Sequence, residues 1–425
     1  MPIAVTILES RVEFVEQPFV KPLIISSGAI THLTEARVTV LCRANDRMAS
    51  GHGSIYLSDL WAWPDPSRSH AQRDQALRRI CSGIAADLPA RCGGRPAHPL
   101  ELGLQLHQAV CADGGADAAV PVLARAMCLS PFDAAIHDAA GLALDCPAFD
   151  LYCDDQPLPS ADPWLAPEGA CAAIRRTLQP PRKSLPAWIL VGKDDDLDRD
   201  MRPWAITRGY HCFKIKIMGR DNAVDVARTI AVFRAAQRFG VTAPRLSLDS
   251  NEANPSAESV RDYLLNLQAD APDAYDALQY LEQPTGRDIR KAVFDWKPVA
   301  ALKPVLLDEG LTAMELMEES RLQGWSGFAL KTCKGHSFAL VAAAWACRHG
   351  MLIAMQDLTN PGFALLHAAL FAARLPTLNG VELNSPQFTP DANGPWLPRL
   401  AALFEPRDGN HQLPDTMPPG LGSSL

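Results

Sequence analysis

Five short apolar runs in the middle of the chain each end in charged residues, and this repeated pattern constrains the fold more than any other feature. The endings recur at roughly 25–35-residue intervals, a spacing that suits the strand-helix units of a parallel barrel. In such a barrel the carboxyl ends of the strands converge on one mouth. The charged endings are Lys214-Ile215-Lys216, Asp249, Glu282, Asp308 and Lys331.

Eight short apolar runs in about 200 residues predict an α/β fold with a modified TIM-type (β/α) barrel of about seven to eight units. An open doubly wound sheet is the alternative. It usually carries a glycine-rich phosphate turn after its first strand, and the Gly-Lys-Asp-Asp-Asp that begins at Gly192 is not one. The predicted strands are Ala187–Val191, Cys212–Ile217, Arg245–Leu248, Leu278–Leu281, Pro304–Leu307, Gly327–Leu330, Leu352–Met355 and Gly380–Leu383.

The N-terminal part predicts a separate α+β domain. Residues 4–15 and 36–42 are rich in apolar and β-branched residues, and turn residues lie at 26–28 and 43–47. Helical spacing of apolar residues follows over 71–86, 101–111 and 118–144. Proline-rich connections then favour three parts, which are residues 1–165, the barrel over 185–385, and a C-terminal segment over 386–425.

The composition excludes several classes of function. The chain has 425 residues and a net charge of −8, so its field repels nucleic-acid backbones. The longest apolar runs, 338–347 and 363–370, are shorter than the ~18 residues of a membrane helix. The N-terminus lacks a signal peptide's features, and the 11 cysteines form no Cys-x-x-Cys pair. These features predict a cytoplasmic protein with reduced thiols that binds neither nucleic acid nor membrane.

Strand parity places the charged endings on one face. Side chains alternate along a strand, so Lys214 and Lys216 point into the barrel together and Asp249 shares its face with Asn251. Two like charges about 4 Å apart repel by about 4 kcal/mol at an effective dielectric of 20. Three converging carboxylates therefore require positive charge between them, and oxygen ligands without His or Cys favour Mg²⁺ first and Mn²⁺ second. Structural salt bridges between the lysines and the acids are the alternative.

The ordered motifs resemble those of the enolase superfamily, specifically its muconate lactonizing enzyme subgroup within the mandelate racemase/muconate lactonizing enzyme family. They are Lys-x-Lys, Asp-x-Asn, Glu-Gln-Pro, Asp-Glu and Lys-x-x-Lys-Gly on the second to sixth strands. Residues 130–147 are similar to the helix that ends the subgroup's capping domain, and 414–422 to its closing segment. The resemblance implies that residues 1–165 cap the barrel and that 386–425 returns to the cap.

The resemblance also implies a reaction and its residues. Asp249, Glu282 and Asp308 would ligate Mg²⁺, and the ion would hold the carboxylate of a small-molecule substrate. Lys216 and Lys331 would face the α-carbon from opposite sides, and proton removal would give an enediolate. The supporting residues would be Lys214 and Lys334, which tune the two lysines, and Asn251, which orients a bound water or carboxylate.

Specificity is expected to rest on the cap and on the last two strands. The loops 21–28 and 51–63 are the predicted lids. Glu309 has the opposite parity to Asp308, so it is predicted to pair with a lysine outside the lumen. The candidate substrate contacts are Tyr56, Trp61, Asp357, Glu382 and Asn384.

Opposed lysines make racemisation or epimerisation the simplest outcome, and cycloisomerisation shares the same intermediate. An acid-sugar dehydratase of the mandelate racemase type is the alternative enzyme, but that subgroup places a His on the seventh strand and residues 352–357 contain none. A non-catalytic, enolase-like binding protein is the alternative outside enzymes. The sequence of such a protein would lack one of the metal ligands or one of the bases, and this sequence lacks none of them. A symmetric homo-oligomer is expected, because barrels of this kind commonly form one.

Overall fold

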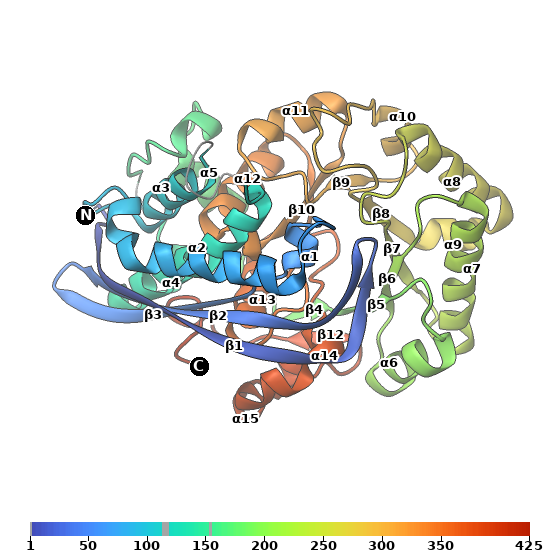
Figure 1. Cartoon of the computed structure of the whole chain (residues 1–425), viewed down its shortest axis with the longest axis horizontal. Coiled ribbons are helices and arrows are strands. Elements are labelled where there is room, and N and C mark those ends of the chain that lie inside the picture. Colours follow the sequence, from blue (N-terminus) through green and yellow to red (C-terminus); the bar gives the residue numbers. More distant parts are fainter. Residues whose placement is uncertain (1, 113–118, 153–154) are drawn as a thin grey trace.

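The computed structural model describes residues 2–112, 119–152 and 155–425. It contains an antiparallel sheet of three strands, a parallel sheet of seven and an antiparallel pair. In Figure 1 the three-stranded sheet and its helices occupy one side of the molecule, and the curled parallel sheet with its outer helices occupies the other. The predicted α/β class and the separate N-terminal sheet are confirmed.

The N-terminal sheet is a long hairpin with one further strand. Strand β1 (Val5–Ile25) pairs with β2 (Gly28–Ala44), and β3 (Arg47–Tyr56) lies on the other side of β2. Because β1 continues to Ile25, the hairpin crosses to the parallel sheet (Figure 1), where Ser26 Oγ donates a hydrogen bond to the Asn251 carbonyl at 2.9 Å. Most of the segment 21–28, which was predicted to be a loop, is therefore strand, although it still covers the cavity described below.

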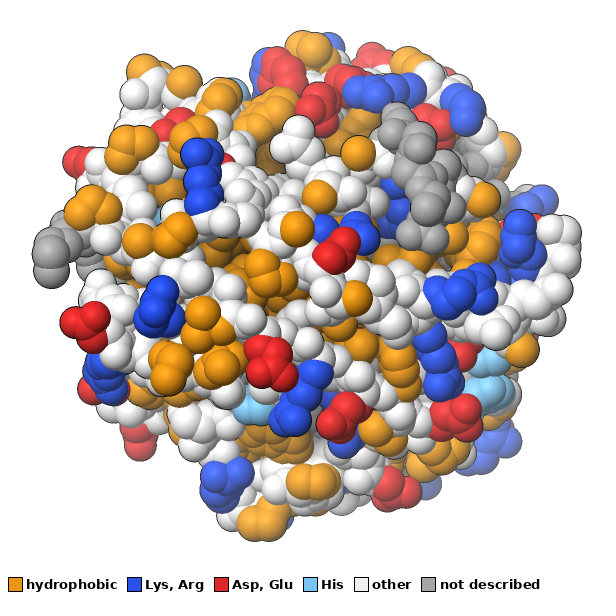
Figure 2. All heavy atoms as spheres, turned by 60° about the vertical axis from the view of Figure 1, so that its left-hand side comes forward, with side chains coloured by type: hydrophobic (Ala, Val, Ile, Leu, Met, Phe, Trp, Pro, Cys, Tyr) orange, Lys and Arg blue, Asp and Glu red, His pale blue; other side chains and the backbone are white. Residues whose placement is uncertain are grey.

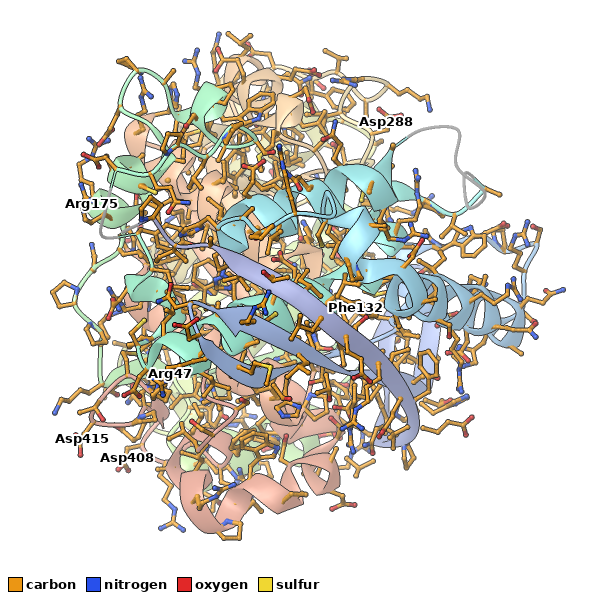
Figure 3. All side chains as sticks on the ribbon, turned by 90° about the vertical axis from the view of Figure 1, so that its left-hand side faces the viewer. Arg47, Phe132, Arg175, Asp288, Asp408 and Asp415 are labelled. Atoms are coloured by element: carbon orange, nitrogen blue, oxygen red, sulfur yellow. The ribbon has the colours of Figure 1, made fainter. Side chains whose placement is uncertain are left out.

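Helix α4 (Val122–Leu144) packs so closely on β3 that two strand positions have no room for a side chain. A Cβ on Gly53 would stand 1.9 Å from the Pro131 carbonyl oxygen, and one on Gly51 would stand 2.1 Å from the Ala139 nitrogen. Residues 51–56 are therefore strand rather than the predicted lid, which shrinks to 57–63. Figure 3 labels Phe132, a fully buried residue of α4.

The helices of this part agree with the sequence prediction, except that the expected helix start at Ala118 lies outside the described residues. The helices are α1 (Asp59–Ala62), α2 (His70–Arg91), α3 (Pro99–Cys111) and α4 (Val122–Leu144), followed by the short turns η1 (Ala148–Asp150) and η2 (Asp162–Leu165) and by α5 (Ala170–Thr177).

Seven of the eight predicted parallel strands are confirmed, each within one residue at either end. They follow one another in the sheet in chain order, so every neighbour is joined by a crossover. The strands are β5 (Trp188–Val191), β6 (Cys212–Lys216), β7 (Arg245–Asp249), β8 (Leu278–Glu282), β9 (Val305–Leu307), β10 (Gly327–Lys331) and β11 (Leu352–Gln356).

The predicted eighth strand, 380–383, is wrong. The segment makes only isolated bridges, Val381 to Ala187 and Glu382 to Gln356. At the β11 edge the Glu382 NH donates to the Met355 carbonyl and the Asp357 NH donates to the Glu382 carbonyl, each at 3.0 Å. Side-chain amides add hydrogen bonds at both edges of the sheet. The Asn379 side chain accepts a hydrogen bond from the backbone NH of Met355 on β11 and donates one to its carbonyl. The Gln387 side chain does the same with the backbone NH and carbonyl of Leu190 on β5. The edge groups are thereby satisfied without a further strand.

Helices cover the outside of the parallel sheet, and in Figure 1 α7, α8 and α9 lie outside β6, β7 and β8. The helices of this part are η3 (Leu197–Met201), α6 (Arg202–Arg208), α7 (Asn222–Arg238), α8 (Ala257–Asp270), α9 (Pro272–Ala277), α10 (Lys297–Ala300), α11 (Glu315–Gln323), η4 (Thr332–Lys334), α12 (His336–Arg348), α13 (Gly362–Arg374), α14 (Ser385–Phe388), η5 (Pro390–Trp396) and α15 (Leu397–Phe404).

The C-terminal segment runs back to α4. Strand β12 (Asn410–Gln412) pairs with β4 (Ser184–Pro186). Further on, the Leu421 NH donates to Asp138 Oδ1 on α4 at 2.7 Å. The far end of the chain is therefore tied to the N-terminal helices by a hydrogen bond to a buried carboxylate.

The surface carries charges of both signs scattered among apolar side chains, as the face in Figure 2 shows. No helix in the described part of the chain is long and apolar enough to cross a membrane.

Two buried histidines predict how stability depends on pH. Burial lowers the pKa of His367 to about 3 and that of His411 to about 4. In the unfolded chain each would take up a proton near pH 6.5. The unfolded state therefore binds more protons below pH 6.5, and the free energy of unfolding is expected to fall by about 1.4 kcal/mol per pH unit for each residue between pH 6 and 4.

Urea titrations from pH 7 to 4 would measure this slope. His411→Asn keeps a donor for the Leu403 carbonyl, which His411 Nδ1 contacts at 2.7 Å, but removes the titration. The free energy of unfolding of the variant is expected to depend on pH less steeply than that of the wild type, by about 1.4 kcal/mol per pH unit. Identical slopes for the two proteins would contradict this account.

Candidate active site

The carboxyl ends of the parallel strands enclose one cavity in which charged side chains face each other. Strand β6 contributes two lysines and β10 a third, while β7, β8 and the loop after β9 contribute acids between them. The charged and amide residues that line the cavity are Lys214, Lys216, Asp249, Asn251, Glu282, Asp308, Glu309, Lys331, Gln356, Glu382 and Asn384.

The register of the strands sets this row of charges. Lys216 is the partner of Asp249 across β6 and β7, and Asp249 is the partner of Glu282 across β7 and β8. On the next strand Glu282 pairs with Leu306, and Asp308 follows directly after the end of β9. Neighbouring strands lie about 4.8 Å apart, so these side chains touch.

The two lysines of β6 bind the acids of β7 and β8. Lys214 Nζ contacts Glu282 Oε1 directly and lies 3.4 Å from Asp249 Oδ2 and 3.2 Å from Glu382 Oε2. Lys216 Nζ contacts Asp249 Oδ2 and donates to Asn251 Oδ1 at 2.8 Å. All three acids are nearly inaccessible to solvent.

The lysines of β10 and η4 bind the acid that follows β9. Lys331 Nζ contacts Asp308 Oδ2 directly and donates to Gln356 Oε1 at 2.6 Å. Lys334 Nζ lies 3.2 Å from Asp308 Oδ1. Gln356 also donates to Glu282. This glutamine joins the two halves of the row, and sequence reasoning missed it, although it shares its parity with Ala354 and is the register partner of Lys331.

Burial and pairing shift the pKa values of these groups in opposite directions. Burial would raise the pKa of Asp249, but the charges of Lys216 and Lys214 outweigh it and hold the pKa well below its usual range. Against the same penalty, Lys331 and Lys334 hold the pKa of Asp308 at about 2. Burial would lower the pKa of Lys331, but Asp308 and Glu282 raise it. Asp249, Asp308 and Lys331 are therefore charged in the geometry described.

The cavity holds more acid than base. Its described lining carries five carboxyl groups and three ammonium groups, and Lys334 adds a fourth ammonium group behind Asp308. Burial and the neighbouring Asp249 carboxylate outweigh the lysines and raise the pKa of Glu282. Burial and Asp308 raise the pKa of Glu309 to about 7. The surplus of buried oxygen donors fits an added hard cation.

The lysine ammonium groups, however, occupy the carboxylate oxygens that would serve such a cation. Among the described residues, no group of three or more His, Cys, Asp or Glu side chains is arranged around a common ion position. The types and burial of Asp249, Glu282 and Asp308 suit a divalent ion, and their oxygens would have to exchange ammonium for metal to hold one.

Three of the five candidate substrate contacts line the cavity and two do not. Trp61, Glu382 and Asn384 are in its wall. Tyr56 packs instead against Phe19, with ring centroids 6.2 Å apart, because strand parity turns it to the hairpin. Asp357 faces away from the cavity and accepts a hydrogen bond from Thr332 Oγ1 at 3.0 Å.

The position predicted for Glu309 is also wrong. It lines the cavity rather than the outside of the sheet, and its Oε1 accepts a hydrogen bond from Trp61 Nε1 at 2.8 Å. Strand β9 ends at Leu307, so strand parity no longer governs Glu309.

An apolar wall closes the cavity on the side of the cap. Leu23, Ile25 and Ile30 come from the hairpin of β1 and β2, and Leu190 and Leu358 come from the parallel sheet and the loop after it. Leu23 and Ile25 lie in the segment 21–28 that the sequence predicted as a lid. No local sequence signal marked Ile30, Leu190 or Leu358, because their role depends on how the hairpin crosses the mouth of the curled sheet. The site therefore combines a charged floor with an apolar roof.

No family model matches the sequence, and no curated protein sequence matches it either. The fold is nevertheless shared over nearly the whole chain with solved enolase-superfamily proteins. A muconate lactonizing enzyme from Pseudomonas fluorescens, solved with muconolactone, is 19% identical, with 99% of this chain and 96% of that chain covered and a TM-score of 0.66.

Two further structures carry magnesium. A dipeptide epimerase from Enterococcus faecalis, solved with Mg and the dipeptide L-Leu-L-Tyr, is 16% identical, with 98% of this chain and 99% of that chain covered and a TM-score of 0.65. An enolase from Bradyrhizobium, solved with magnesium and mandelic acid, is 18% identical, with 99% and 95% covered and a TM-score of 0.63. The resemblance predicted from the motifs is confirmed at the level of the fold, which this chain shares with these enolase-superfamily proteins.

Removing Lys214 is expected to be costly, because it leaves Glu282 and Glu382 buried without their cation. Lys214→Met should lower the free energy of unfolding by about 3–5 kcal/mol in metal-free buffer, measured by urea denaturation. Adding Glu282→Gln should restore part of the loss, since the stranded charge is then removed.

Lys183→Met is the matched control. Lys183 Nζ lies 3.0 Å from Asp415 Oδ1, but both side chains are exposed, and Figure 3 shows Asp415 at the periphery of the molecule. Its removal should cost less than about 1 kcal/mol. Equal losses at the two lysines would show that the buried row does not depend on charge compensation.

Proposed function

We propose that this protein is a Mg²⁺-dependent enzyme that removes a proton α to a substrate carboxylate, giving an enediolate, and most simply acts as a racemase, epimerase or cycloisomerase. One observation carries the proposal. Lys216 and Lys331 line the same cavity from β6 and β10, and the three strands between them lead into Asp249, Glu282 and Asp308. Two amines thus flank a set of oxygen ligands.

Asp249, Glu282 and Asp308 would hold the metal. When bound, Mg²⁺ supplies positive charge that stabilises the developing enediolate oxygen. The surplus of buried carboxyl groups supports this assignment, as do the two structures of the same fold that contain magnesium. The remaining acids, Glu309 and Glu382, would stay as neighbours of the substrate.

The lysines can act as bases only after they leave their acids. Asp308 and Glu282 raise the pKa of Lys331, and a protonated amine cannot accept a proton. The free space in the cavity is about 40 Å³, room for few water molecules. Swinging the ammonium groups off the carboxylates would both free ligand oxygens and open space at the α-carbon.

The proton transfers then follow from the placement of the two amines. The neutral Nζ of one lysine takes the α-proton, and the C–H electron pair passes into the carboxylate to form the enediolate. The ammonium of the other lysine returns a proton from the opposite side, which inverts the centre. Ring closure or opening at the same intermediate would give cycloisomerisation with a single lysine. The apolar roof and Trp61 would exclude water from these steps.

α-Proton exchange tests the proposal directly. A panel of carboxylates, including dipeptides, N-acyl amino acids and sugar acids, would be incubated in deuterated water with Mg²⁺ and followed by NMR. Wild-type enzyme is expected to incorporate deuterium into at least one class. Lys216→Ala and Lys331→Ala should each slow exchange of one enantiomer by about 10²–10⁴-fold, because each loses one base.

Lys183→Ala, at the exposed Asp415 pair, is the control and should exchange at the wild-type rate. Full exchange of both enantiomers by Lys216→Ala would exclude it as a base. A 2-keto sugar acid as product would instead favour a dehydratase.

Metal binding gives an independent prediction. Mg²⁺ at 100 times its Kd is expected to stabilise the folded protein by about 2.7 kcal/mol, measured by thermal unfolding alongside calorimetric titration. Asp308→Asn should lose most of this gain, because it removes an anionic ligand. Asp415→Asn, on the exposed surface, should keep it. An unchanged gain in Asp308→Asn would remove Asp308 from the ligand set.

A further inference from the structure

The four-residue helix α1 is held in shape by side chains outside its own segment. A helix leaves its last carbonyls without partners, and α1 is too short to pair them itself. The Leu60 carbonyl accepts from Ser27 Oγ at 3.2 Å. The Trp61 and Ala62 carbonyls accept from the two terminal nitrogens of Arg287 at 3.1 and 3.4 Å. The hairpin and the loop after β8 therefore complete this helix.

Arg287 is itself fixed by one carboxylate. Its backbone NH donates to Glu252 Oε2 at 2.7 Å, and its Nε lies 2.9 and 3.0 Å from the two oxygens. Glu252 follows the end of β7 and has a positive φ of 68°, a conformation that non-glycine residues adopt rarely. The fork of Arg287 is thus aimed at α1 by a carboxylate held in a strained turn beside the active site.

Helix α1 in turn carries the indole that covers one proposed base. Trp61 is 6% exposed, and its ring centroid lies 5.7 Å from Lys331 Nζ. Its Nε1 donates to Glu309 at the cavity wall. The other end of α1 stays with the N-terminal helices, because Asp59 Oδ2 accepts from Arg73 Nε at 2.7 Å. The position of Trp61 therefore depends on whether α1 is docked on Arg287.

We propose that Arg287 and Glu252 form a latch that docks α1 and thereby sets Trp61 over Lys331. Arg287 is a positioning residue that acts through Trp61, since it does not reach the cavity. Docking excludes water from Lys331, and release returns the α1 carbonyls to solvent and uncovers the amine. The role of Lys331 as a base rests on the proposed function, but the latch itself does not.

Covering of Lys331 can be measured without a substrate. An amine-reactive reagent would be applied to wild type, Arg287→Met, Trp61→Leu and the double variant, with Lys331 labelling read by peptide mass spectrometry. Hydrogen exchange over 57–64 would report docking of α1. Arg287→Met is expected to speed both labelling and exchange at least about tenfold, the effect of losing hydrogen bonds from a charged donor.

Two further variants separate the latch from general destabilisation. Arg290→Met removes an exposed pair with Glu319 near Asp288, which lies at the molecular edge in Figure 3, and should behave as wild type. Arg287→Lys keeps the charge but not the two-pronged fork, so it should restore the protection of Lys331 from labelling only in part. Thermal unfolding of each variant would confirm that it is folded.

The double variant decides whether Arg287 acts through Trp61. Arg287→Met should add less than about twofold to the labelling of Trp61→Leu, because the cover is already gone. With an exchanging substrate, both single variants should lower kcat more than they raise KM. Wild-type labelling in Arg287→Met, or multiplicative effects in the double variant, would overturn the latch. Absence of any α-proton exchange would contradict the proposed function. It would not affect the labelling experiment, which uses no substrate and tests the latch alone.

Discussion

A row of opposite charges, buried at the carboxyl ends of neighbouring strands, is the constraint on which the rest of the structure depends. The strand register aligns Lys216, Asp249 and Glu282 side by side, and burial removes the water that would screen them. Each carboxylate therefore needs a cation in contact. With Lys334 counted, the cavity holds five carboxyl groups and four ammonium groups, and this surplus of buried oxygen donors is the condition that suits a divalent ion.

The rest of the molecule serves to keep this row in place and away from water. Asn379 and Gln387 bond edge residues of the parallel sheet with side-chain amides, where no regular eighth strand is present. The hairpin of β1 and β2 lays Leu23 and Ile25 over the mouth. A low-dielectric roof strengthens every charge interaction beneath it, which ties the packing of the N-terminal sheet to the chemistry of the strand ends.

Much of the charged floor was predictable, because strand spacing and parity are local properties. They brought the acids and lysines of β6, β7, β8 and β10 together correctly in space. The failures have a common cause. Glu309 lies beyond the end of its strand, Tyr56 lies on a strand that was interpreted as a loop, and Gln356 was passed over for its neighbour Asp357. In each case the position of the side chain depends on where a strand begins or ends, and side-chain alternation alone does not specify that boundary.

The sequence by itself determined the kind of fold and the set of charged groups that meet at the strand ends. The alternation of side chains along each strand and the spacing of the strand ends are properties of the sequence. Like charges that meet in this way require opposite charge between them. Only the tertiary structure decided which lysine holds which acid, which apolar residues roof the site, and that Arg287 completes a helix more than 200 residues earlier in the chain. Those contacts depend on how distant segments pack, and no local pattern records that.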